Sequence, residues 1–191
     1  LAAGGTGGHM FPAEALAEEL ILRGYKPILV TDNRGSLYKG LLGRIECYTV
    51  PSGSLSNPGF VGKINGLVMN FFGFFRAKVL LSGLAPRAVV GFGGYPSFPT
   101  MLAATRLGTP AAIHEQNAVL GRVNQLLANR VNFIALSYDG TKLVPRNILD
   151  RCVVTGNPLR SSILENKTIY QPPSENGDID LVVLGGSQGA R

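Results

Sequence analysis

The sequence predicts an α/β fold in which a parallel sheet is covered by helices on both faces. Short, apolar, β-branched segments alternate with helical segments along most of its 191 residues. Strands that are apolar throughout are typical of parallel sheets that are buried on both faces. Glycine-rich turns follow several of these strands, and such turns are a common strand-to-helix connection in this class of fold.

The strands and helices are predicted from apolar periodicity and turn residues. In the first helix, Pro12 suits the first turn, Glu14 lies near the positive end of the helix dipole, and Gly24 favours termination. The predicted strands are residues 1–3 (the end of a truncated strand), 27–31, 46–50, 88–90, 111–114, 131–136 and 152–154. The predicted helices are residues 12–23, 37–42, 61–84, 98–107, 120–128 and a short one near 139–143.

The composition changes after Leu164. Residues 165–178 are polar and contain Pro172 and Pro173, which is typical of an interdomain linker. Residues 179–191 then begin with a strand and a glycine-rich turn, and one strand cannot bury a core. We therefore expect one domain over 1–164, a linker over 165–178, and the start of a mostly absent second domain over 179–191, with both ends of the chain cut.

Charge and cysteine content restrict the partners. The formal net charge of +6 favours anionic partners such as phosphates or an acidic membrane. The basic residues form no dense run, so no nucleic-acid partner is expected. Cys47 and Cys152 have neither metal-site nor disulfide spacing, and we expect a reducing cytoplasm.

A strand followed by a glycine-rich turn occurs three times, at residues 4–9, 91–95 and 185–189. Such turns let a ligand approach the backbone, and the next helix directs N–H groups at it, which suits a pyrophosphate. A single turn of this kind is often only a tight connection. The first turn lacks the Gly-Lys-Ser/Thr of a P-loop and the third glycine of a dinucleotide fingerprint. Asp32 remains as a ribose-binding acid for an alternative, an NAD-dependent oxidoreductase.

Two histidines lie near the ends of predicted strands. His9 lies at the mouth of the first proposed anion site, where an imidazole can accept a proton near neutral pH. His114 begins the run His114-Glu115-Gln116-Asn117 at the end of another strand. Four polar side chains there are costly to bury without a purpose. They either form part of a site or cap the next helix.

The helix predicted over 61–84 is apolar on nearly all sides. Such a helix is either buried in the core or faces something other than water, and both readings remain open. Lys63, Arg76 and Lys78 flank it, which suits a contact with an anionic membrane surface, whereas its polar residues disfavour a transmembrane span. The expected membrane-contact residues are Ile64, Val68, Phe71, Phe74 and Phe75.

Five motifs, in order from one end of the chain to the other, resemble the MurG family of bacterial glycosyltransferases. They are Gly4-Gly5-Thr6-Gly7-Gly8-His9, Gly93-Gly94-Tyr95, His114-Glu115-Gln116-Asn117, Gly156-Asn157-Pro158-Leu159-Arg160 and Gly185-Gly186-Ser187-Gln188-Gly189-Ala190-Arg191. The resemblance implies a GT-B fold of two Rossmann-like domains, of which this chain carries the N-terminal, acceptor-binding one. It also implies an inverting transfer of N-acetylglucosamine from UDP-GlcNAc to lipid I, which forms lipid II in peptidoglycan synthesis.

The resemblance assigns roles to individual positions. His9 matches the general base, and the phenylalanine-rich helix matches a membrane contact on the cytoplasmic face of the inner membrane. Neither a cofactor nor a metal is implied. The implied UDP-GlcNAc contacts are Thr6, Gly7, Gly8, Asn117, Arg160 and Ser187, and the implied acceptor or pyrophosphate loops contain Gly5, Gly93, Gly94, Tyr95 and Glu115.

The resemblance also leaves alternatives. The family's uracil and ribose contacts in the rest of the second domain have no counterpart here, so we expect this chain to be inactive alone. An alternative hypothesis is that the chain is the non-catalytic, membrane-recruiting half of a two-subunit glycosyltransferase. A nucleotide-sugar 2-epimerase shares the architecture but does not need the aromatic surface.

Overall fold

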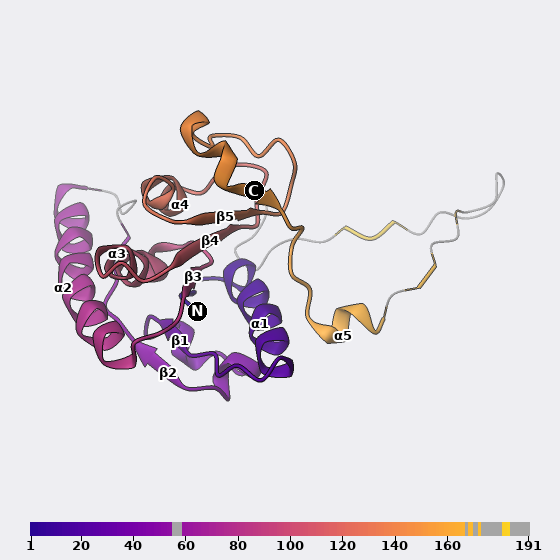
Figure 1. Ribbon diagram of the computed structural model, residues 1–191, viewed down its shortest axis with the longest axis horizontal. Coiled ribbons are helices and arrows are strands. Elements are labelled where there is room, and N and C mark those ends of the chain that lie inside the picture. The colour runs from indigo at the N-terminus through magenta and orange to yellow at the C-terminus, as the bar shows by residue number, and fades with distance from the viewer. Residues whose placement is uncertain (55–58, 167, 170–171, 173–180, 184–191) are drawn as a thin grey trace.

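The computed structural model describes residues 1–54, 59–166, 168–169, 172 and 181–183, and it forms a parallel α/β domain (Figure 1). The strands are β1 (Leu29–Thr31), β2 (Cys47–Thr49), β3 (Val89–Gly91), β4 (Ala111–Glu115), β5 (Phe133–Leu136) and β6 (Cys152–Val154). The α-helices are α1 (Gly7–Leu22), α2 (Phe60–Leu84), α3 (Phe98–Arg106), α4 (Arg122–Leu127) and α5 (Ser161–Leu164). The 3-10 helices are η1 (Gly35–Leu37), η2 (Leu41–Gly43), η3 (Tyr95–Ser97) and η4 (Arg146–Arg151).

Residues 1–3, where the sequence predicts the end of a strand, lie in the middle of the sheet. Ala2 bridges in parallel to Val30 of β1 and to Gly91 of β3, and its N–H donates to the Val90 carbonyl at 2.8 Å. The order across the sheet is therefore β2, β1, residues 1–3, β3, β4, β5 and β6, and every pair is parallel. The chain winds outward in one direction through β1 and β2 and in the other through β3 to β6. The first segment is thus the point at which the winding reverses, where ligands of such sheets bind.

The two faces of the sheet have separate cores because alternate residues of a strand point to opposite faces. Ala2 and Val30 belong to the core that includes residues of α2, α3 and α4. Ala3 and Leu29 belong to the core beneath α1 and η2. Figure 1 shows α1 on the opposite side of the sheet from α2 and α3. This arrangement confirms the predicted sheet with helices on both faces.

The first helix begins at Gly7 rather than at Pro12, so its predicted start was wrong. Thr6 precedes it in an extended conformation, and the Thr6 carbonyl accepts hydrogen bonds from the N–H groups of His9 and Met10. Glycine has low helix propensity, which is why the sequence suggested a loop there, but tertiary packing overrides that preference. The second half of the glycine-rich turn is therefore the first turn of α1.

Other segments also differ from the prediction. The helix expected over 37–42 is replaced by the two 3-10 turns η1 and η2, and residues 139–143 are not helical. Neither η4 nor α5 was predicted. Most of the expected linker and half of residues 179–184, where the sequence predicts a strand, lie outside the residues that the structure describes, so the domain boundaries stay predictions.

Helix α2 contacts the domain through a narrow stripe of mostly small residues. An added Cβ at Gly73 would lie 1.9 Å from the Pro51 carbonyl oxygen, so the helix and this loop touch through their backbones. The Asn70 side chain accepts from the Gly53 N–H at 3.1 Å and donates to the Gly53 carbonyl at 2.9 Å. The buried residues of α2 are Gly66, Asn70, Gly73, Ala77 and Leu81.

The large apolar side chains of α2 point mostly to solvent. Ile64, Val68, Phe71 and Phe75 are exposed, whereas Phe74 is partly buried and packs against the core, which corrects its assignment to the outward face. Among the residues described, α2 is the one helix long and apolar enough to cross a bilayer, with a mean hydropathy of 1.4 over its most apolar stretch. Its small-residue stripe is nevertheless packed on the domain, so α2 is neither a buried core helix nor a detached one.

We expect the Gly73→Ala variant to be less stable than the Gly83→Ala variant. Both changes raise helix propensity by about 1 kcal/mol. At position 73 the new methyl meets the Pro51 carbonyl, and the required shift costs roughly 1–3 kcal/mol, whereas the position 83 methyl meets no atom within 4 Å. Urea unfolding followed by circular dichroism measures the difference. Equal free energies of unfolding would contradict the backbone contact.

Candidate functional site

The glycine-rich turns after residues 1–3 and after β3 meet at the point where the winding reverses. A pocket of about 280 Å³ lies there, at the carboxyl ends of the strands. It brings together His9 from α1, the second turn, and the segment that follows β4. Its lining consists of His9, Gly93, Gly94, Tyr95, Glu115, Asn117, Gly121, Arg122, Val123 and Asn124.

The imidazole of His9 lies against the second glycine-rich turn. A Cβ added at Gly93 would be 3.3 Å from His9 Cδ2, and one added at Gly94 would be 3.5 Å from His9 Cε1. Both glycines also have positive φ angles, 84° and 73°, which residues with a side chain rarely adopt. Glycine at these two positions therefore serves both the turn and the close approach of the ring.

His9 is held and tuned by its surroundings. Its Nδ1 lies 3.3 Å from the Thr6 hydroxyl oxygen. Burial lowers the pKa of His9 below its ordinary value, and the negative charge of Glu115 partly opposes this shift. The ring is therefore neutral at pH 7. In the tautomer whose Nδ1–H donates to Thr6, Nε2 carries a lone pair that can accept a proton.

Glu115 forms one wall of the pocket, and both oxygens of its carboxylate accept hydrogen bonds. The side chain is 1% exposed. Oε1 accepts from the backbone N–H and the side-chain amide of Asn117, at 3.0 and 2.9 Å. Oε2 accepts from the Gly121 N–H at 2.8 Å and from Asn124 Nδ2 at 2.9 Å. Four donors on one buried carboxylate fix the loop between β4 and α4.

His114 and Gln116 brace the same loop from behind. His114 Nε2 lies 3.1 Å from the Gly156 carbonyl, and Gln116 Nε2 lies 3.0 Å from His114 Nδ1. A neutral imidazole with its proton on Nε2 satisfies both contacts. Burial lowers the pKa of His114, which favours that neutral form. The polar run at the end of β4 therefore lines the pocket and supports it, and it also contacts the start of α4, because Glu115 accepts from the Gly121 N–H.

Other predicted site residues border the pocket or lie elsewhere. Thr6 contacts His9, and the N–H groups of Gly7 and Gly8 precede the first intrahelical hydrogen bonds of α1. Gly5 is exposed, with a φ of 89°, and does not line the pocket. Ser187 lies outside the described residues.

Arg160 is not part of the pocket lining. Its guanidinium carbon lies 4.1 Å above the centre of the Phe11 ring on α1. Its Nη1 is 3.5 Å from Glu14 Oε2. The implied donor-contacting arginine therefore lies beside α1, farther along the helix than the first turn.

The sequence reasoning missed Asn124. Its Nδ2 donates to Glu115 and to the His114 carbonyl, and its Oδ1 has no hydrogen-bond partner within the described part of the chain. The sequence offers a signal for Asn124. Gly121 and Arg122 start the helix that follows the polar run, which places Asn124 in the first turn of that helix. Asp32, the basis of the oxidoreductase alternative, accepts from the Gly35 N–H at 2.9 Å and pairs with Arg34, so its carboxylate caps a turn.

Within the residues described, no group of three or more His, Cys, Asp or Glu side chains is arranged to hold a metal ion. Cys47 and Cys152 are both free thiols. Asp178 and Asp180, which have Asp-x-Asp spacing, lie outside the described residues. A metal-independent reaction therefore stays a prediction.

Two relatives of this chain among known proteins carry the same name. A protein of Rhodospirillum rubrum named UDP-N-acetylglucosamine–N-acetylmuramyl-(pentapeptide) pyrophosphoryl-undecaprenol N-acetylglucosamine transferase is 50% identical over 192 residues, covering all of this chain and 49% of that protein. A protein of the same name from Paramagnetospirillum magneticum is 47% identical, over all of this chain and 52% of that protein. The chain thus spans about half the length of the curated relatives it matches.

A solved structure agrees with these relatives. The crystal structure of Acinetobacter baumannii MurG superposes with a TM-score of 0.65 at 30% identity, over 84% of this chain and 44% of that one. The model of the glycosyltransferase family 28 N-terminal domain matches residues 1–136, which contain the middle strand, both glycine-rich turns of the pocket and the polar run after β4. The resemblance read from the sequence is confirmed, and the chain belongs to glycosyltransferase family 28, whose N-terminal domain it carries.

Proposed function

We propose that the whole protein is an inverting glycosyltransferase that moves N-acetylglucosamine from UDP-GlcNAc to lipid I, forming lipid II in peptidoglycan synthesis. In this proposal, the chain supplies the acceptor-binding half. The observation that carries it is the neutral imidazole of His9, packed against Gly93 and Gly94 in a pocket at the carboxyl ends of the strands. The names of the relatives supply the donor and acceptor.

The geometry supports a direct displacement. Nε2 of His9 removes the proton from the 4-hydroxyl of the acceptor sugar, and the oxygen attacks the anomeric carbon of the donor. The bond to the diphosphate breaks as the new bond forms, so UDP leaves and the configuration inverts. The N–H groups at the start of α1, together with Arg160, offset the charge that develops on the diphosphate.

Helix α2 is proposed to contact the cytoplasmic face of the inner membrane as a peripheral anchor. Ile64, Val68, Phe71 and Phe75 present apolar side chains, and Lys63 and the neighbouring basic residues suit anionic headgroups.

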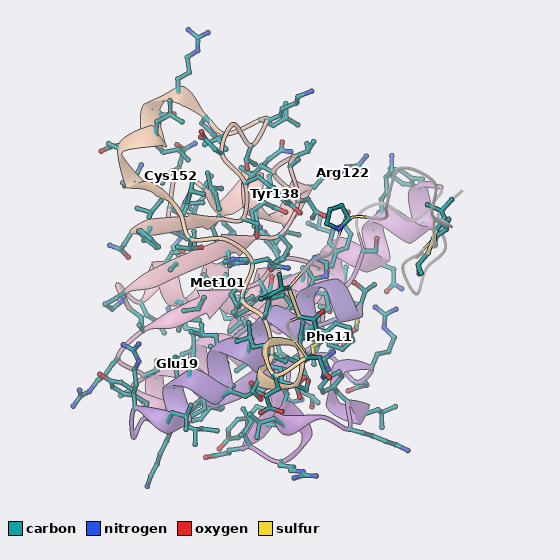
Figure 2. The ribbon with its side chains drawn as sticks, turned by 90° about the vertical axis from the view of Figure 1, so that its right-hand side faces the viewer. Phe11, Glu19, Met101, Arg122, Tyr138 and Cys152 are labelled. Atoms are coloured by element: carbon teal, nitrogen blue, oxygen red, sulfur yellow. The ribbon has the colours of Figure 1, made fainter. Side chains whose placement is uncertain are left out.

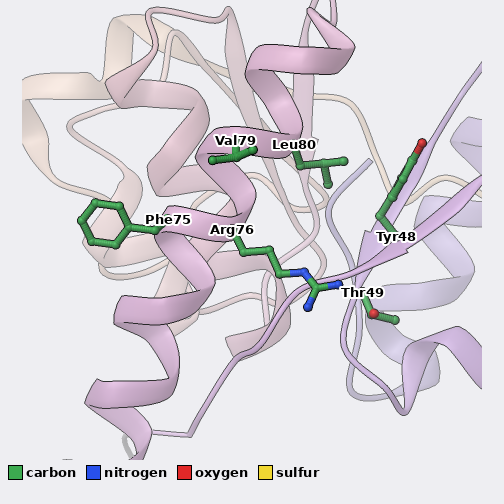
Figure 3. Close-up of a pocket in the computed structure, with 6 residues that line it drawn as sticks. All are labelled: Tyr48, Thr49, Phe75, Arg76, Val79 and Leu80. Carbon is green, nitrogen blue, oxygen red and sulfur yellow. The ribbon is translucent and has the colours of Figure 1, made fainter.

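A groove of about 510 Å³ lies beside this face, between α2 and the edge strand β2. Figure 3 shows Arg76 extending from α2 toward Thr49, with Val79 and Leu80 on the same helix. The groove places a cation at the border of the apolar face, where a headgroup phosphate would lie.

In a full-length protein, we expect His9→Ala to lower kcat by at least about 100-fold, the usual contribution of a general base. The dissociation constant for UDP-GlcNAc should change little, because His9 acts on the acceptor. Steady-state kinetics and calorimetry measure the two quantities. Unchanged turnover would remove His9 from the role of base.

The pH dependence of kcat/KM follows from the burial of His9. Desolvation disfavours the charged imidazolium and lowers the pKa of His9 from 6.5, so the neutral base is available above that lowered value. We expect kcat/KM to rise along an acidic limb with an apparent pKa below 6.5 and to be level near pH 7. A limb centred above 6.5 would contradict the assignment.

Membrane binding is tested by Phe72→Ser, with Leu22→Ser as the matched control. Phe72 on α2 is 62% exposed, and Leu22 on α1 is 82% exposed. Burying a phenylalanine contributes roughly 1.5–3 kcal/mol, so Phe72→Ser should weaken binding to anionic vesicles by about tenfold. Vesicle co-sedimentation of the full-length protein reports the effect. Equal losses from the two variants would exclude α2 as the contact.

A further inference from the structure

We propose that Glu14 is a positioning residue that holds the guanidinium of Arg160 against α1, across the Phe11 ring from the N-terminal turn of that helix, ready for the diphosphate of a nucleotide sugar. The inference rests on the proposed function, because it takes the diphosphate as the ligand of that turn. No sequence motif indicated this role, since Glu14 looked only like a carboxylate near the positive end of a helix.

Glu14 is a buried carboxylate with an ordered environment. It is 3% exposed on α1, and its Oε1 accepts from the Leu41 N–H. Its Oε2 accepts from the Tyr38 hydroxyl at 2.8 Å. Gly40 leaves room for the group, since a Cβ there would lie 2.0 Å from Oε1. A charge this deeply buried must be paired or hydrogen-bonded, and here its position is fixed from two sides.

Tyr38 stays protonated and keeps donating to Glu14. Burial, followed by the hydrogen bond to Glu14 and its charge, raises the pKa of Tyr38 to about 12. Because Tyr38 and Leu41 already donate to Glu14, its carboxylate is hydrogen-bonded without relying on Arg160 alone. The guanidinium touches it through Nη1 at 3.5 Å, and an arginine carries five N–H donors. This contact orients the arginine without using its full hydrogen-bonding capacity.

The ring of Phe11 sets the distance between Arg160 and the first turn of α1. One face of the ring lies 4.1 Å from the guanidinium carbon. The ring edge also packs on Gly7, where an added Cβ would be 2.8 Å from Phe11 Cε2. The guanidinium is thus separated by one aromatic ring from the turn whose N–H groups face the proposed diphosphate. Figure 2 shows Phe11 beside the coil of α5, whose N-cap is Arg160.

A second contact one turn farther along α1 fixes the backbone at the start of α5. The Ser161 N–H donates to Glu18 Oε2 at 3.0 Å. Glu18 therefore anchors the main chain, while Glu14 and Phe11 orient the side chain of the preceding residue. Among the described residues, the carboxylate that pairs with the guanidinium is that of Glu14, and Phe11 and Tyr38 supply its uncharged neighbours.

The test compares Glu14→Gln with wild type in a full-length protein, using UDP and uridine as calorimetric probes. Glutamine keeps the size of the side chain and an oxygen acceptor but loses the negative charge. We expect the dissociation constant for UDP to rise about fivefold, within the range measured for coupled pairs. The constant for uridine, which has no phosphate, should stay unchanged. The effect on UDP should vanish in an Arg160→Ala background.

Glu19→Gln is the matched control, because it removes the same charge from α1 at an exposed position paired with Arg23. Figure 2 places Glu19 farther along α1 than Phe11. It should leave both constants unchanged. Equal weakening of UDP and uridine by Glu14→Gln, or additive effects of Glu14→Gln and Arg160→Ala, would overturn the inference. Wild-type protein that fails to bind UDP would overturn the proposed function as well, whereas normal wild-type binding with an unaffected variant would overturn the inference alone.

Discussion

The rest of the structure depends on the pairing of residues 1–3 with strands on both sides. Ala2 and Ala3 are fully buried, and their backbones join β1 to β3. Because this segment is the middle of the sheet, the turn that leaves it emerges beside the turn that leaves β3. The pocket exists because these two turns are neighbours. Alanine suits the position, since helices cover the segment from both faces.

Glycines and buried polar side chains contribute to the pocket in different ways. Gly93 and Gly94 let the backbone approach the imidazole of His9. Glu115 draws four donors to its carboxylate and fixes the opposite wall. His114 ties that wall to Gly156 after β6. The imidazole of His9 therefore lies between these two walls, and its Nδ1 contacts the Thr6 hydroxyl.

Much of this could be predicted from sequence, because apolar strands and glycine-rich turns are local signals. The strands followed from them, and so did the place of His9 at the first glycine-rich turn. Its contact with Gly93 and Gly94 depends on the order of the strands in the sheet, which no local signal encodes. The start of α1 did not, since glycine favours a loop until packing decides otherwise. The place of Arg160 depends on Phe11 and Glu14, which are distant in sequence. The outward face of α2 was ambiguous because its contact stripe contains glycines, which hydrophobic periodicity does not detect.

On α2, the side chains that attach the helix to the domain are different from the apolar side chains that it exposes. Gly66, Asn70 and Gly73 attach the helix through backbone contacts and an amide pair. Phe71, Phe72 and Val79 contribute little burial to the folded state. Substitutions among the displayed side chains are thus nearly neutral for folding. Natural selection can therefore change this face without compensating changes in the core.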